Sequence, residues 1–211
     1  MRPIIAVDGP AAAGKGTLAR RLAATLGLPY LDTGLGGGAV GRRVLDAGGD
    51  PADAMVAEAA ARALQPRDLD RGDLRGPQAD GAAAAVASVP GVRAALLAFQ
   101  REFAARAGAV LDGRDIGTVI FPQANAKLFV TASLAERARR RWQELRTNDT
   151  DVEIGTVERD MRQRDAKDAA RAAAPLKAAD DAFQLDTSAM DAEAAFQCAL
   201  AFIRTRIGGG P

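Results

Sequence analysis

A glycine-rich segment near the N-terminus has the residue types and the spacing of a phosphate-binding loop. It consists of Gly9, Pro10, Ala11, Ala12, Ala13, Gly14, Lys15, Gly16 and Thr17, which fits G-x-x-x-x-G-K with a hydroxyl two residues later. Backbone N–H groups of such a loop converge on phosphate oxygens, and the helix that follows adds a favourable dipole. Lys15 would reach the β- and γ-phosphates, and the Thr17 hydroxyl would face a Mg²⁺ ion. The segment predicts a nucleoside triphosphate site rather than a chance glycine-rich turn, and it leaves the acceptor open.

A second polar group follows the apolar run at residues 109–111. It consists of Asp112, Gly113, Arg114 and Asp115. Arg114 offers a planar fork for phosphate, and Asp115 offers acceptors for an exocyclic amino group. Asp112 stands where a carboxylate can orient the water shell of a metal ion. The alternative is a solvated ion pair in a turn.

A third polar group, Asp32-Thr33, ends the apolar run that begins at Leu28. Ligands bind at the carboxyl edge of open α/β sheets, where these residues are expected to lie. The alternative is a helix cap, a role that suits both residue types.

Basic side chains gather on two predicted helices around a polar loop at residues 146–152. They are Arg137, Arg139, Arg140, Arg141, Arg159, Arg162, Arg164 and Arg171, with Asp168 among them. A run of charges is usually a solvated helical face. In a chain that binds a triphosphate, a lid that closes over the phosphates and excludes water is the better interpretation. Arginines of such a lid stabilise charge as the phosphoryl group moves.

The composition narrows the chemistry further, because the chain has no histidine and a single cysteine, Cys198. These counts exclude Ser-His-Asp and Cys-His catalysis, an intrachain disulfide framework and the usual zinc ligand sets. Phosphoryl transfer needs little beyond Arg, Lys, Asp, Thr, backbone amides and a hard cation. With 28 basic and 27 acidic residues the net charge is +1, so we expect neither nucleic acid nor membrane as a partner. No apolar run reaches transmembrane length, and we expect a cytoplasmic protein.

Short apolar runs alternate with helical patterns along the 211 residues. We predict strands over residues 4–7, 28–32, 109–113, 126–130 and 182–186. We predict helices over residues 15–27, 39–47, 52–64, 78–88, 90–107, 133–146, 152–166 and 191–207. This alternation is typical of an α/β fold with a parallel sheet and helices on both faces. No apolar heptad pattern stands out, so we expect a monomer.

Five motifs occur in the order found in bacterial cytidylate kinases. They are DGPAAAGKGT, LDTG, VPGVRAALLAFQREFA, VLDGRDIGTVIFP and RDAKDAARAAAPL, and the match runs from Ile4 to about Asp186. GRDIGTV together with RD-x-x-D-x-x-R is not the pattern of adenylate, guanylate or shikimate kinases. The chain therefore resembles the nucleoside monophosphate kinases that act on CMP and dCMP.

The resemblance implies a P-loop fold of three layers, α/β/α, in a single kinase domain over residues 1–211. A short monophosphate-binding insert would lie at about residues 65–90 and a helical lid at about residues 137–165. The implied reaction moves the γ-phosphoryl group of ATP to CMP or dCMP, with Mg²⁺, in pyrimidine nucleotide metabolism. Residues 9–17 would hold ATP, and Thr17 would contact Mg²⁺, with Asp112 acting through water.

The resemblance also implies a role for each acceptor-site residue. Arg93 and Asp115 would recognise the cytosine, Arg114 the acceptor phosphate, and Arg164 with Asp168 the ribose; Thr33 and Arg171 complete the CMP site. Catalytic roles would fall to Lys15, Arg114, Arg140, Arg141 and Arg164. The chemistry agrees, because the cytosine edge has a donor at N4 beside acceptors, whereas uracil would set a carbonyl against the carboxylate.

The chain departs from the family pattern at four positions. Gly37 and Gly38 replace Tyr-Arg, whose arginine contacts the acceptor phosphate, and Ala84 replaces a serine that helps to read the base. We expect the glycines to weaken the start of the next helix, and Arg42 and Arg43 to lie on its solvated face. Ala12, where many members have glycine, is tolerable if its φ is negative. These departures keep open a kinase for another acceptor, or a variant that mainly binds nucleotide.

Overall fold

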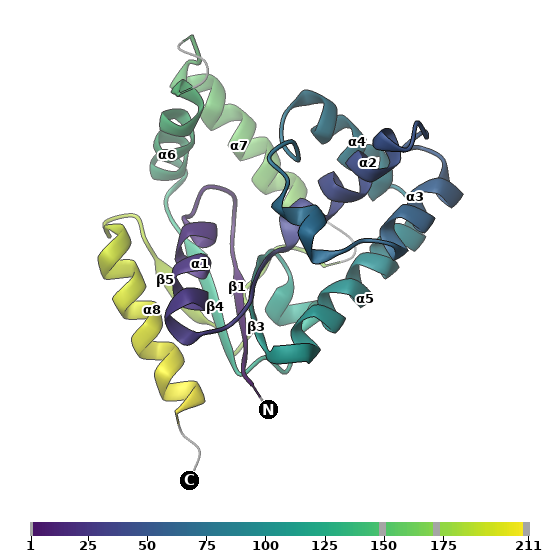
Figure 1. Cartoon of the computed structure of the whole chain (residues 1–211). Helices are drawn as coiled ribbons and strands as arrows, with labels where there is room; N and C mark the ends of the chain where they lie inside the picture. Colours follow the sequence, from purple (N-terminus) through teal and green to yellow (C-terminus); the bar gives the residue numbers. More distant parts are fainter. Residues whose placement is uncertain (1, 148–150, 171–173, 209–211) are drawn as a thin grey trace. The chain divides into compact units, whose positions relative to one another are not determined.

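The computed structural model describes residues 2–147, 151–170 and 174–208 (Figure 1). Arg171, expected in the CMP site, and the centre of the 146–152 loop lie outside the described residues. The chain divides into two compact units. The first comprises residues 1–30 and 109–211, and the second comprises residues 31–108. The insert expected at about residues 65–90 falls inside the second unit.

A five-stranded sheet carries the phosphate loop. Its strands are β1 (Ile4–Asp8), β2 (Tyr30–Asp32), β3 (Ala109–Gly113), β4 (Ala126–Thr131) and β5 (Phe183–Asp186), in the spatial order β2-β3-β1-β4-β5. The neighbours β1–β3, β1–β4 and β4–β5 pair in parallel. Because parallel strands end at the same edge, the residues after β1 and β3 are brought together there. The predicted α/β fold with a central parallel sheet is confirmed.

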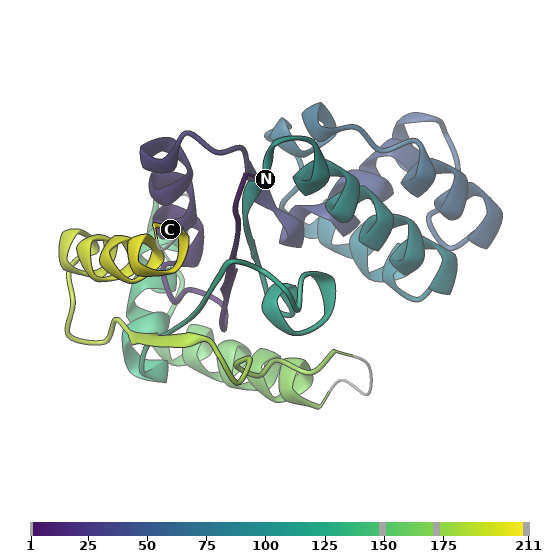
Figure 2. The ribbon, with the colours of Figure 1, turned by 90° about the horizontal axis from the view of Figure 1, so that it is seen from below.

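Two helices cover one face of this sheet in the first unit, α1 (Lys15–Leu26) and α8 (Ala192–Ile207) (Figure 2). Leu22 of α1 and Ile203 of α8 are fully buried in a core shared with apolar residues of β1, β3, β4 and β5. Cys198 is half-buried and packs against this core, consistent with a structural thiol. The core therefore holds α1 in place directly after the phosphate loop.

The predicted lid helices are α6 (Leu134–Arg146) and α7 (Ile154–Ala169), which pack on each other (Figure 1). They share a small core of Ala138, Val157 and Met161, against which Trp142 packs. Ser133 caps α6, since its hydroxyl accepts from the Glu136 N–H at 3.2 Å.

The second unit is helical apart from the end of β2. Its helices are η1 (Thr33–Leu35), α2 (Gly36–Asp46), α3 (Ala54–Arg62), η2 (Pro66–Asp70), α4 (Pro77–Ala87) and α5 (Pro90–Ala107), and a further short helix, η3 (Ile116–Ile120), follows β3 in the first unit. Across the described ranges, no single helix is long and apolar enough to cross a membrane. Among the described helices, Gln78–Ala87 and Pro90–Ala107 pass that test when taken together, on length and composition alone, but the pair is bent by 100°.

Helix α2 begins at Gly36, so the expectation that this helix starts near residue 39 is wrong. The glycines face neighbouring backbone. A β-carbon at Gly41 would lie 2.7 Å from the Ala82 β-carbon, and one at Gly38 would lie 2.9 Å from the Leu74 carbonyl oxygen. The missing side chains therefore allow a close approach that offsets the low helix propensity of glycine. An arginine at position 38 would require Leu74 to move.

Arg42 and Arg43, expected on the solvated outer face of this helix, are partly exposed there, with 27% and 41% of their side chains accessible, and both form ion pairs. Arg42 pairs with Asp46 (2.8 Å) and Asp73 (3.2 Å), and Arg43 pairs with Asp68 (3.1 Å). Both arginines thus tie α2 to residues 68–73 within the second unit.

Alanine substitutions in α2 should have opposite effects at Gly37 and Gly41. At Gly37 a β-carbon would lie 3.7 Å from the nearest atom, an ordinary contact, so Gly37→Ala should stabilise the protein by up to about 1 kcal/mol through helix propensity. Gly41→Ala would press on α4 and should destabilise by about 1–3 kcal/mol. Urea unfolding measures both, and equal effects would contradict the packing role.

Candidate active site

The phosphate loop connects β1 to α1, and its two signature glycines are required by its backbone. Gly9 has φ +147°, and a β-carbon there would lie 1.9 Å from the Val130 carbonyl oxygen. Gly14 has φ +88° and precedes the first residue of α1. Any other residue would be strained at both positions, and at Gly9 it would also collide with β4. The two glycines that define the motif are thus the two loop residues whose backbone angles only glycine adopts without strain.

Ala12 does not meet the condition under which alanine is tolerated without strain, because its φ is +57° and not negative. The left-handed conformation costs a residue with a β-carbon about 1–2 kcal/mol. The Ala12 side chain packs against the core of Ala138, Val157 and Met161 in α6 and α7. This contact with α6 and α7 partly offsets the backbone cost.

Four carbonyl oxygens of the loop accept hydrogen bonds from side chains that come from four different parts of the first unit. Gly9 accepts from Arg114 (3.1 Å), Pro10 from Lys15 (2.9 Å), Ala11 from Arg137 (3.4 Å) and Ala13 from Thr187 (3.3 Å). With their carbonyls satisfied in this way, the loop residues can turn N–H groups toward a phosphate. The loop is held by its surroundings as well as by its own glycines.

Asp8, the last residue of β1, is buried next to the loop. Its Oδ1 accepts from the Ile116 N–H at 2.8 Å and its Oδ2 from the Gly117 N–H at 2.7 Å. Burial raises the pKa of Asp8 to about 6, although the two N–H bonds and Lys15 favour the charged form. The negative charge of nearby Asp115 also raises the pKa of Asp8.

Arg114 and Asp168, both predicted for the acceptor site, lie in direct contact. Arg114 Nε donates to Asp168 at 3.0 Å, and Asp168 is 2% exposed. The alternative of a solvated ion pair in a turn does not hold, because Arg114 pairs with a residue of α7 and the two side chains are only 18% and 3% exposed. Asp115 follows Arg114 directly and precedes η3.

The residues expected to hold Mg²⁺ fit a hard cation that also contacts phosphate. Asp112 is buried, accepts a hydrogen bond from the Tyr30 hydroxyl at 3.2 Å, and lies 3.2 Å from where a β-carbon at Gly16 would be. Thr17 is exposed in the first turn of α1. Within residues 2–147, 151–170 and 174–208 no group of three or more acidic or sulfur ligands gathers. A hydroxyl and one carboxylate beside substrate phosphates suit Mg²⁺, which keeps several waters.

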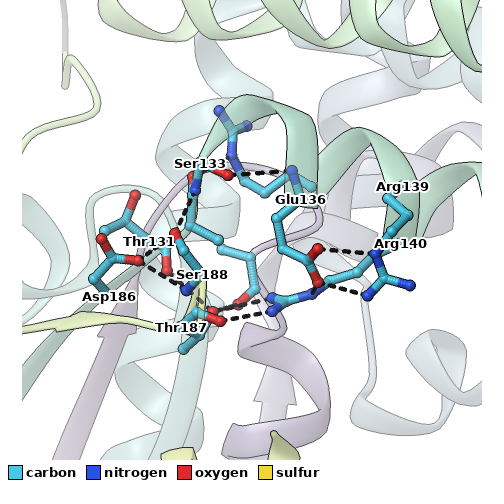
Figure 3. Close-up of polar contacts among 11 residues, drawn as sticks. Thr131, Ser133, Glu136, Arg139, Arg140, Asp186, Thr187 and Ser188 are labelled. Atoms are coloured by element: carbon cyan, nitrogen blue, oxygen red, sulfur yellow. Dashed lines mark hydrogen bonds and ion pairs between the residues drawn. The ribbon is translucent and has the colours of Figure 1, made fainter. Parts of the chain in front are cut away.

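The three predicted lid arginines lie in different surroundings. Arg140 donates through Nε to Glu136 (2.8 Å) and through both Nη atoms to Thr187, at 3.0 and 2.7 Å (Figure 3). Arg141 is half-buried and pairs with Glu144 at 3.1 Å, whereas Arg164 is exposed on α7. Glu136 also binds Arg139, and these bonds lower the pKa of Glu136 to about 2. Arg140 thus fastens α6 to the segment after β5.

The remaining predicted residues belong to the second unit. Thr33 is half-buried in η1, and Arg93 is exposed in the first turn of α5. The helix-cap alternative for Asp32 is confirmed, because its carboxylate accepts from the Gly34 N–H at 3.0 Å. Arg75 approaches the same carboxylate to 3.5 Å. Ala84 is exposed on α4.

Three buried polar residues surround the loop without having been predicted as site residues: Asp8, Thr187 and Arg137, which the sequence placed only among the basic side chains of the lid. Arg137 binds Asp165 through two bonds of 3.1 and 2.7 Å, so it is a structural anchor of α6 and α7. A signal existed for Asp8, a charged residue that ends an apolar strand. No sequence signal separates Arg137 from its neighbouring arginines, or Thr187 from other threonines.

Comparison with known proteins decides the family. The sequence model of the cytidylate kinase family matches residues 5–205. The chain belongs to the cytidylate kinase family. It is 59% identical to the cytidylate kinase of Acidiphilium cryptum over 99% of each chain, and 60% identical to that of Paramagnetospirillum magneticum over 98% of this chain and 100% of the relative. A solved structure of an uncharacterized protein from Eubacterium ventriosum shares the fold, with a TM-score of 0.57 and 14% identity over 97% of this chain and 100% of that chain.

The stability of the protein should depend on the charge of Asp8. The folded-state pKa of about 6 lies above the ordinary value of 3.8, so the folded protein binds the Asp8 proton more tightly than the unfolded chain does. The stabilisation that results is fully present below about pH 4 and is lost as pH rises through 6. Relative to Asp8→Asn, the free energy of unfolding of the wild type should fall by roughly 2–3 kcal/mol from about pH 4 to 7.5, since each pKa unit is worth about 1.4 kcal/mol. Urea unfolding of both proteins across this range measures the difference, in which other titrations cancel. A constant difference would refute the assignment.

Proposed function

We propose that this chain transfers the γ-phosphoryl group of ATP to CMP and dCMP. Membership of the cytidylate kinase family supports this function. The observation that carries it in the structure is the anchoring of Arg114 on both the phosphate loop and Asp168. This contact places a guanidinium beside the loop, where donor and acceptor phosphates must meet in a phosphoryl transfer.

On the donor side, the N–H groups of residues 9–17 and the N-terminus of α1 bind the phosphates of ATP. Lys15 is buried with its ammonium held at the Pro10 carbonyl, inside the loop, so its charge is available to the β- and γ-phosphates after a short movement. Thr17 and Asp112 would hold Mg²⁺, Asp112 through water. The ion neutralises charge on the phosphates when bound.

On the acceptor side, Arg114 binds the CMP phosphate through its planar fork, and Asp115 accepts from the cytosine N4 amino group. Arg93 joins Asp115 on the base, Arg164 and Asp168 bind the ribose, and Thr33 contributes to the same nucleotide. Asp168 accepts from hydroxyls without acting as a general base. Since the transition state is loose, positioning the acceptor oxygen matters more than removing its proton.

Arg140, Arg141 and Arg164 supply positive charge from the helical lid as the phosphoryl group moves. Arg140 is already oriented by Glu136 and Thr187, which limits the side-chain entropy lost in binding. We further propose a cytoplasmic monomer with one kinase domain over residues 1–211, no nucleic acid or membrane partner, and a place in pyrimidine nucleotide metabolism. In that domain the lid spans about residues 137–165, and the insert spans about residues 65–90.

A coupled assay of ADP formation tests the function, with CMP, dCMP, UMP, AMP and shikimate as acceptors. Turnover with CMP and dCMP should exceed turnover with the others. No turnover with either cytidine monophosphate, despite ATP binding by calorimetry, would overturn the proposal. Turnover with another acceptor alone would support the alternative kinase that the departures at Gly38 and Ala84 suggested.

Asp115→Asn should change the acceptor preference, because an amide can donate to the uracil O4 carbonyl where a carboxylate only accepts. We expect kcat/KM for CMP to fall about 10–100-fold, the loss of a charge-assisted bond, while the ratio of UMP to CMP turnover rises. The KM for ATP serves as the internal control. An unchanged ratio would show that Asp115 does not read the base.

A further inference from the structure

Asp8 stands out among the buried groups because the donor and acceptor roles described above do not use it. It is 4% exposed, and its two oxygens accept from two successive backbone N–H groups, those of Ile116 and Gly117. Burying a carboxylate is costly, and hydrophobic packing alone would favour an apolar residue here. A buried carboxylate at this position therefore points to a functional role for its bonds to the Ile116 and Gly117 N–H groups.

The two bonds fix the chain on one side of Asp115. On the other side Arg114 is fixed by Gly9 and Asp168. Asp115 therefore lies between two anchors, one on Asp8 at the end of β1 and one on Gly9 at the start of the phosphate loop. A shift of the segment away from Asp8 would move Asp115 while Arg114 stayed in place.

We propose that Asp8 is a positioning residue that holds the Asp115 turn at the phosphate loop and so sets the place of the acceptor base. The inference rests on the proposed function, since it needs Asp115 to contact CMP. The side chain of Asp8 donates nothing to the loop, whose carbonyls have their own donors. Loss of the carboxylate should therefore act on CMP more than on ATP.

The charged groups that face Asp8 are Lys15 from α1 and Asp115 from the turn. Lys127 of β4 lies against Gly117 and pairs with Asp181 at 2.8 Å. Protonation of Asp8 removes its negative charge and makes one of its oxygens a hydroxyl, a poorer acceptor, so the N–H bond to that oxygen weakens. The hold on the turn should weaken at mildly acidic pH.

The experiment compares Asp8→Asn with a matched control, Asp53→Asn. The Asp53 carboxylate also accepts from two successive N–H groups, those of Met55 and Val56, but it is exposed at the start of α3. Asp8→Asn should lower kcat/KM for CMP at least about tenfold at pH 7.5, with KM for ATP changed less than about threefold. Asp53→Asn should leave both constants within about twofold.

The ratio of wild-type to Asp8→Asn kcat/KM for CMP, followed from about pH 7.5 to 5, is the second measurement. It should shrink toward unity as Asp8 is protonated. The CMP phosphate also titrates near pH 6, but it does so with both enzymes and cancels in the ratio. A ratio that stays constant, or equal losses for ATP and CMP, would show a merely structural role and overturn the inference.

Gly117→Ala is a second variant that tests the same inference if Asp8→Asn does not fold. A β-carbon there would lie 3.3 Å from Asp8 Oδ2 and 3.1 Å from Lys127 Cδ, so it should push the turn by a few tenths of an ångström. The same CMP-selective loss is expected, and its absence in a folded variant would overturn the inference. Failure of the wild type itself with CMP would instead refute the proposed function.

Discussion

The first unit depends on one constraint, which is that the phosphate loop can present N–H groups to a ligand only if its carbonyls find donors elsewhere. Buried carbonyls without donors cost free energy comparable to a lost hydrogen bond. Here the donors are side chains from α1, from the turn after β3, from α6 and from the segment after β5. Helix α1, the turn after β3 and α6 are therefore tied to the loop directly, and α7 is tied to it through the bonds of Asp165 to Arg137 and Asp168 to Arg114. A change in any of them alters the surface that meets the phosphates.

The ion pair of Arg114 and Asp168 extends the same arrangement toward the acceptor. A buried pair contributes little net stability, because desolvation offsets the attraction, but loss of one partner leaves an uncompensated charge. The pair is therefore better understood as a device for orientation. It presents the remaining guanidinium N–H groups of Arg114 in a fixed direction, which suits a planar group that must recognise phosphate.

Helix α2 shows how packing can replace local preference. Glycines at positions 36–38 and 41 disfavour a helix by propensity, yet α2 runs from Gly36 to Asp46. Their hydrogen atoms face Leu96, Ala83, Leu74 and Ala82, and these contacts leave no room for larger groups at Gly38 and Gly41. At position 38, where the family pattern has arginine, the Leu74 carbonyl oxygen lies 2.9 Å from where a β-carbon would be.

The sequence alone determined the α/β fold class, the order of strands and helices along the chain, and the phosphate loop. These features follow from local periodicity and from spacing within a few residues. The sequence also identified Asp115 and Arg114 through motifs that resemble a known family. Only the tertiary structure decided the positive φ of Ala12, the start of α2 and the partners of Arg42, since each depends on atoms distant in sequence. The same holds for Asp8, Arg137 and Thr187, whose roles arise from burial beside the loop. Residue type and spacing predict which groups can bind a phosphate, whereas the surroundings that orient those groups exist only once distant segments pack together.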